Sequence, residues 1–118
     1  MKYLTLPLVA VLCSISSYSA AFGAIAIDQN DSSNAPAYGF SINQPSRQIA
    51  QQVAVDYCRQ YGSNCKAIVW FETCGAYANS SRHYGYGYGA TKAKASADAL
   101  SMCGSNSCRI VVAECQGQ

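Results

Sequence analysis

Six cysteines constrain the fold of this chain more than any other feature. The sequence contains seven, but Cys13 lies in an N-terminal segment that we expect to be removed. An even number is typical of an exported domain whose cysteines are all paired in disulfides. A zinc site would need close C-x-x-C pairs and usually histidines, so metal binding is not predicted. The six are Cys58, Cys65, Cys74, Cys103, Cys108 and Cys115.

The N-terminal segment 1–21 has the features of a secretory signal peptide. Lys2 precedes an apolar run of about a dozen residues, and small polar residues then lead to Ala21, after which we place cleavage. A retained membrane anchor is an alternative, but a spanning helix needs about 20 apolar residues. Acylation of Cys13 is another, but Leu12 stands where a small residue is expected. We therefore expect residues 22–118 to be periplasmic or secreted, with no membrane span after cleavage.

The composition bounds the remaining possibilities. A chain of 118 residues, 50% of them apolar, has room for one domain. Charged residues make up 12%, and the net charge of +2 includes Lys2 of the removed segment. The nearly balanced charge does not predict a surface that binds phosphates, so we expect no nucleic-acid partner.

The two halves of the expected mature chain resemble each other. Residues 23–74 match residues 75–115, with Gly23–Ala26 on Gly75–Ala78 and the cysteines in the same order. Each half predicts two strands, a helix and a third strand, because alternating apolar runs flank a helical period. We expect an α+β fold: two pseudo-symmetric units, an antiparallel or mixed sheet, and two helices on one of its faces.

The expected elements follow from this plan. In the first half Ser46 is a plausible N-cap, and apolar side chains recur at helical spacing from Ile49 to Tyr57 until the helix ends near Gly62. The strands are expected at 24–27, 37–42 and 67–71 in the first half, and at 76–78, 84–88 and 109–113 in the second, whose helix is expected at 91–103.

The repeat also predicts how the cysteines pair. Cys58 with Cys65, and Cys103 with Cys108, would each close a corner between a helix and a strand. The remaining two, Cys74 and Cys115, end equivalent segments, so we expect their bond to tie the two units together near a pseudo-twofold axis. Each bridge would contribute about 2–4 kcal/mol.

Several features together carry a resemblance to a known family: the cysteine order, Gly23–Ala26, Ala37–Gly39, Ser46, and Tyr86–Thr91. On these features the chain resembles an uncharacterised family of exported bacterial proteins, domain of unknown function 4189. The resemblance implies the fold and export, and it brings no catalytic residues. The chain departs from the family early in the two helices, where the family usually has glutamates. Here these positions hold Gln48, Ile49, Lys94 and Ala95.

The segment Tyr84–Gly89 alternates tyrosine and glycine, which places three phenol rings on one face of a strand. Either the glycines admit a close neighbour while the tyrosines fill the core, or the tyrosines form an exposed strip. An exposed strip would suit sugar rings or a protein partner. The candidate binding residues are Tyr84, Tyr86, Tyr88 and His83.

Catalysis has two alternative locations. His83 would need Ser80 or Ser81 and a distant aspartate, yet it lies in a predicted turn without an acidic neighbour. Glu72 and Glu114 each lie close before a cysteine, and two carboxyls about 5–10 Å apart can act as acid and base. Equivalent positions of a repeat also place residues together without catalysis, so no catalytic residue and no cofactor are predicted.

A binding role therefore outranks an enzymatic one. We expect an exported binding protein of the bacterial envelope, an inhibitor or immunity-type protein that docks on a protein partner. The alternatives are a module that binds cell-wall glycan through the tyrosines and a small envelope hydrolase.

Overall fold

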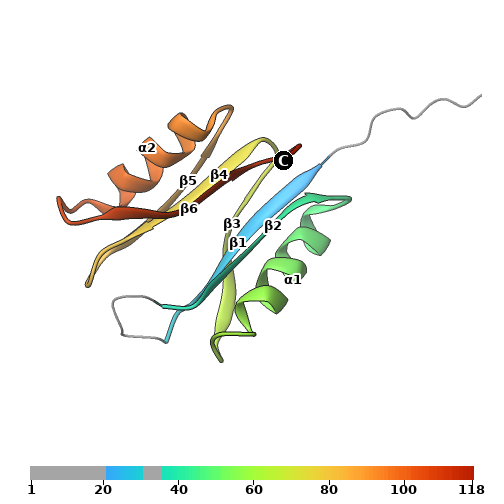
Figure 1. Ribbon diagram of the computed structural model, residues 1–118, viewed down its shortest axis with the longest axis horizontal. Helices are drawn as coiled ribbons and strands as arrows, with labels where there is room; N and C mark the ends of the chain where they lie inside the picture. The colour runs from blue at the N-terminus through green and yellow to red at the C-terminus, as the bar shows by residue number, and fades with distance from the viewer. Residues whose placement is uncertain (1–20, 31–35) are drawn as a thin grey trace, which may run out of the picture.

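The computed structural model describes residues 21–30 and 36–118 (Figure 1). The predicted signal peptide, apart from its last residue, and Cys13 lie outside this range. The elements in chain order are β1 (Phe22–Asp28), β2 (Tyr38–Gln44), α1 (Arg47–Cys58), β3 (Cys65–Phe71), β4 (Cys74–Asn79), β5 (Tyr84–Gly89), α2 (Lys92–Cys103) and β6 (Arg109–Cys115).

The α+β class and the two strand-strand-helix-strand units are confirmed, but the layers differ from the predicted arrangement. Each unit builds its own three-stranded antiparallel sheet, in the orders β2-β1-β3 and β5-β4-β6. The sheets face each other through contacts of β1 with β4 and of β3 with β5. Each helix covers the outer face of its own sheet, so the order is α1, sheet, sheet, α2 (Figure 1). The prediction of one sheet with both helices on one face is corrected accordingly.

The central strand of each sheet explains the four layers. Ala24 and Ala26 of β1 pack toward α1, whereas Ile25 and Ile27 lie in the cluster between the sheets. In β4, Ala76 and Ala78 belong to the cluster under α2, and Tyr77 is buried between the sheets. Side chains alternate across a strand, so both faces of these strands are apolar and each needs its own cover: small residues meet the helix and large ones meet the other sheet.

Equivalent residues of the two units pair in the same register. Ile25 lies opposite Val69 in β3, and Tyr77 lies opposite Val112 in β6. Gly23 pairs with Phe71 in the first unit, as Gly75 pairs with Glu114 in the second. Phe71 and Glu114 are therefore equivalent positions, and Glu72 has no strand position in the first unit.

All three predicted disulfides are confirmed, with one change in the role of the third. The bonds Cys58–Cys65 and Cys103–Cys108 close the two corners between helix and strand. Cys74 and Cys115 are bonded, but they are paired neighbours on β4 and β6 of one sheet. Because Cys74 begins the second unit instead of ending the first, this bond does not tie the units together.

The C-terminal residues make the connection between the units instead. The N–H of Gln116 donates to the carbonyl of Thr73 at 2.8 Å, and its side-chain amide donates to the carbonyl of Phe71 at 3.3 Å. Its side-chain oxygen accepts from the N–H of Asn43, the penultimate residue of β2, which has a positive φ of 61°. One glutamine thus joins the ends of β2 and β3.

Both helices begin at a side-chain cap. The Ser46 hydroxyl accepts from the N–H of Ile49 at 3.1 Å, which confirms the predicted N-cap. Thr91 does the same for Lys94 at 3.0 Å. The first helix ends at Cys58, earlier than predicted, because a turn over the next residues leads into the short disulfide loop.

Candidate functional site

The glycines of β5 face α2. A Cβ atom on Gly85 would lie 2.3 Å from the backbone nitrogen of Cys103, and one on Gly87 would lie 2.4 Å from the carbonyl oxygen of Ala95. Ordinary van der Waals contact is not possible at these distances, so the missing side chains allow the helix to approach the strand. The three tyrosines consequently point to the opposite face, toward the other sheet.

The tyrosines of β5 differ in exposure. Tyr86 is half-buried and packs against the cluster between the sheets. Tyr84 and Tyr88 are 46% and 61% exposed. The strip is therefore a core residue flanked by two surface residues, which combines the two alternatives drawn from the sequence.

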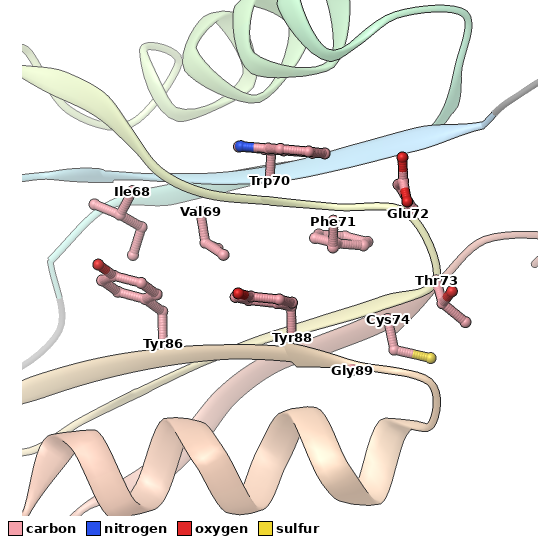
Figure 2. A pocket seen from close by; sticks show the side chains of 10 residues that line it. All are labelled: Ile68, Val69, Trp70, Phe71, Glu72, Thr73, Cys74, Tyr86, Tyr88 and Gly89. Atoms are coloured by element: carbon pink, nitrogen blue, oxygen red, sulfur yellow. The ribbon is translucent and has the colours of Figure 1, made fainter.

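Tyr86 and Tyr88 form one wall of a groove of about 410 Å³ between the edges of the two sheets. Both β3 and β5 are edge strands, and they lie side by side where the sheets meet. In Figure 2 the two phenol rings lie on β5 opposite Ile68, Val69 and Phe71 of β3. We call this the β3–β5 groove; its lining comprises Ile68, Val69, Trp70, Phe71, Glu72, Thr73, Cys74, Tyr86, Tyr88 and Gly89.

Phe71 forms the floor of the groove. Its side chain is 1% exposed and lies where a Cβ on Gly23 or Gly75 would stand, at 2.4 Å and 2.2 Å from its ring atoms. One ring thus fills the space left by a glycine of each central strand. This makes the floor of the groove part of the packing between the sheets.

Trp70 lies on the other side of β3. Its ring points away from the tyrosines, toward the side of α1 (Figure 2). The guanidinium of Arg47 lies 5.0 Å from the ring centroid, a cation–π distance. Phe22 is a further neighbour, with ring centroids 6.1 Å apart. Trp70 therefore supports the wall of the groove from behind.

The charge nearest the groove belongs to Glu72, whose side chain in Figure 2 lies on the Trp70 side of β3, away from the two tyrosines. Among the described residues that line the groove, Glu72 is the only one with an ionisable carboxylate or ammonium group, and it is exposed in the turn after β3. Phenol hydroxyls and Thr73 add neutral hydrogen-bonding groups. Such a groove can hold an apolar group with a cation beside it.

The predicted carboxylate pair does not share this groove. Glu72 lines it, but Glu114 is not among its lining residues. Glu114 is half-buried in β6, a strand at the opposite edge of the second sheet from β5. The groove therefore offers one carboxylate, where an acid–base pair would need two.

His83 lies in the turn between β4 and β5, as the sequence indicates. The N–H of Ser80 donates to the His83 carbonyl at 2.8 Å, and the Ser80 hydroxyl accepts from the His83 backbone N–H at 3.2 Å. His83 and Asp28 line a common hollow on the surface, but the carboxylate oxygens of Asp28 accept hydrogen bonds from the backbone N–H groups of Asn30 and Ser63. The hydroxyl and the carboxylate are thus used by the backbone and do not form a triad with the imidazole.

Two general features complete the site. No group of three or more potential metal ligands occurs within residues 21–30 and 36–118. In the same part of the chain no helix has the length and apolarity to cross a membrane.

Sequence reasoning found one wall of the groove and missed the other. The alternation of tyrosine and glycine identifies Tyr86 and Tyr88, whereas Ile68, Val69 and Phe71 look like an ordinary buried strand. Their signal in the sequence was the length of an apolar run, which does not show that the strand lies at the edge of its sheet.

The fold and the groove define a class: a small α+β domain made of two ββαβ units, held by three disulfides, with an aromatic groove where two sheet edges meet. The chain belongs to the family described as "Domain of unknown function (DUF4189)", whose model matches residues 22–115. No curated protein and no solved structure matches the chain.

Proposed function

We propose that this chain is an exported binding protein of the bacterial envelope that docks on a protein partner through the β3–β5 groove, as an inhibitor or immunity-type protein. The observation that carries the proposal is Tyr88: a phenol ring 61% exposed on a rigid strand, at the mouth of an apolar groove. Exposed aromatic side chains beside apolar pockets are typical of binding hot spots.

The disulfides support both the location and the binding role. Three bonds among fewer than a hundred residues are typical of an oxidising compartment, such as the periplasm or the exterior. The bond Cys74–Cys115 lies next to the groove and fixes the start of β4. A preorganised surface of this kind loses less conformational entropy when a partner binds.

The edge of β5 indicates how a partner would bind. The N–H of Tyr86 donates to the sulfur of Met102 at 3.3 Å, so a side chain of α2 already covers this edge. A partner strand pairing with β5 would have to displace it. We infer that the partner inserts an apolar side chain between Tyr88 and Phe71 and places a cationic side chain beside Glu72.

Catalysis and a glycan-binding tyrosine strip have less support. Glu114 does not line the groove that Glu72 lines, and within the described residues Ser80 is hydrogen-bonded to the backbone of His83. The glycan alternative expected an exposed strip of three tyrosines along β5, but the middle ring, Tyr86, is half-buried. The proposal is therefore binding of a protein instead of glycan at this groove.

Site-specific crosslinking tests the proposal. A photoreactive phenylalanine replaces Tyr88, or in the control Tyr61, which is 68% exposed on α1's side of the molecule. We expect position 88, and not position 61, to crosslink one envelope protein, and an excess of the unmodified chain to prevent it.

The purified partner then provides the quantitative test. Tyr88→Ala and Glu72→Gln are each expected to weaken binding by about tenfold or more, while Lys92→Gln, an exposed residue outside the groove, leaves it unchanged. Equal crosslinking from both positions, or full binding by Tyr88→Ala, would contradict the proposal.

A further inference from the structure

A second pocket lies at the opposite edge of the molecule. It has a volume of about 390 Å³ and lies between β2 and β6, the strands at the other ends of the two sheets from β3 and β5. The proposed docking groove does not use it, because the two share no lining residue. The residues that line this pocket are Pro36, Ala37, Tyr38, Tyr57, Tyr61, Asn79 and Val111.

Three tyrosines dominate the pocket. Tyr61 is 68% exposed and Tyr57 is 37% exposed, at the end of α1. Their ring centroids are 6.1 Å apart and their planes are tilted by 50°. Tyr38 enters from β2, where its ring stands 6.5 Å from that of Tyr77.

The backbone that carries Tyr61 is firmly held. Its N–H donates to the carbonyl of Cys58 at 2.9 Å, and the N–H of Gly62 donates to the same oxygen at 3.0 Å. Cys58 is itself bonded to Cys65, which closes a loop with a sequence separation of 7. The exposed ring is therefore presented from a constrained turn.

The chemistry of the lining selects a neutral ligand. Among the described residues of the pocket none carries a charge, and the polar groups are phenol hydroxyls and the carboxamide of Asn79. The carboxamide nitrogen donates to the hydroxyl of Tyr77 at 3.0 Å. The carboxamide oxygen is the group that can accept a hydrogen bond from a ligand. A charged ligand would lose its hydration here without an opposite charge in return.

The tilt between the rings of Tyr57 and Tyr61 indicates the shape of ligand that fits the pocket. A planar base or aromatic ring is best held between parallel rings, whereas two rings at 50° form a corner. A pyranose in its chair form has apolar C–H faces that meet the rings and hydroxyls around its rim that reach phenols and an amide. We propose that this pocket binds a pyranose unit of a neutral glycan, independently of the docking groove.

Titration with two soluble probes, chitotetraose and cellotetraose, tests this site. We expect saturable binding of at least one of them by calorimetry, and a loss of affinity of about tenfold or more in Tyr61→Ala. The matched control is Tyr88→Ala, which removes a similarly exposed tyrosine from the other edge and is expected to bind the probe like the parent chain.

The two proposals fail separately. Tyr61→Ala is expected to keep the protein partner and lose the sugar, and Tyr88→Ala the reverse. Absence of saturable binding of both probes, or unchanged affinity in Tyr61→Ala, would overturn the glycan site and leave the docking groove unaffected. A fluorescence-monitored urea titration checks that both variants remain folded.

Discussion

At the scale of single residues, the two units differ at one position that faces the helix, where the first has serine and the second has glycine. Ser41 of β2 and Gly87 of β5 occupy equivalent positions, each facing the first turn of its helix. The Ser41 hydroxyl donates to the carbonyl of Ala50 at 2.6 Å, so the first unit accepts a side chain there. In the second unit a Cβ would lie 2.4 Å from the equivalent carbonyl, that of Ala95. The first turn of the helix is therefore closer to its sheet in the second unit, whereas further along the helices Gly39 and Gly85 allow an equally close approach in both units.

This difference gives a stability prediction. Gly87→Ala should lower the free energy of unfolding by about 1–3 kcal/mol, because the methyl group meets backbone of α2 that cannot move without disturbing the helix. Urea denaturation with the disulfides intact measures the effect. Ser81→Ala, an exposed change in the preceding turn, is the control and should be neutral. Unchanged stability of Gly87→Ala would show that the close contact does not exist.

At the scale of elements, strand and helix positions could be predicted from periodicity and turn residues. Each expected element is present, although the strands extend beyond the predicted ends. The cap of the first helix was predicted too, at Ser46, whereas Thr91 was expected as the first residue of the helix that it caps. The end of the first helix was not predictable, since the turn that follows Cys58 depends on its bond to Cys65 and not on a local helix-stop signal.

The cap of α1 provides a second prediction. In the first turn of either helix, both within the described residues, there is no acidic side chain, so the hydroxyl is the main partner of the free N–H groups there. Ser46→Ala should cost about 1 kcal/mol of unfolding free energy, and Ser46→Asp should retain it. Thermal denaturation followed by circular dichroism compares the three chains. Equal stability of Ser46→Ala and the parent would contradict the assigned cap.

At the scale of the whole molecule, two sheets replace the predicted single one, and the candidate groove exists only because of that packing. The pattern of β1 contains a clue, because Ala24 and Ala26 alternate with Ile25 and Ile27 and leave neither face polar. It does not say what covers the larger side chains, which is the second sheet. The pairing of the cysteines was predictable from the repeat. The packing of Phe71 against Gly75 of the other sheet was not.

The disulfides should contribute unequally to global stability. In the chain-entropy model, loss of Cys103–Cys108, with a sequence separation of 5, costs about 2 kcal/mol, and loss of Cys74–Cys115, with a separation of 41, costs about 4 kcal/mol. Double substitutions to alanine and urea titration measure both. A larger loss from the short loop would show that native-state strain or residual structure, not chain entropy, controls the effect.

The central claim is that an oxidised, duplicated scaffold presents its groove outside the cytoplasm. Intact-mass analysis of the chain recovered from cells, before and after thiol labelling, tests it most directly. The account predicts a product that begins at Phe22, lacks Cys13, takes up no label, and is lighter by six hydrogen atoms than its reduced form. A full-length product in the cytoplasm with free thiols would contradict it.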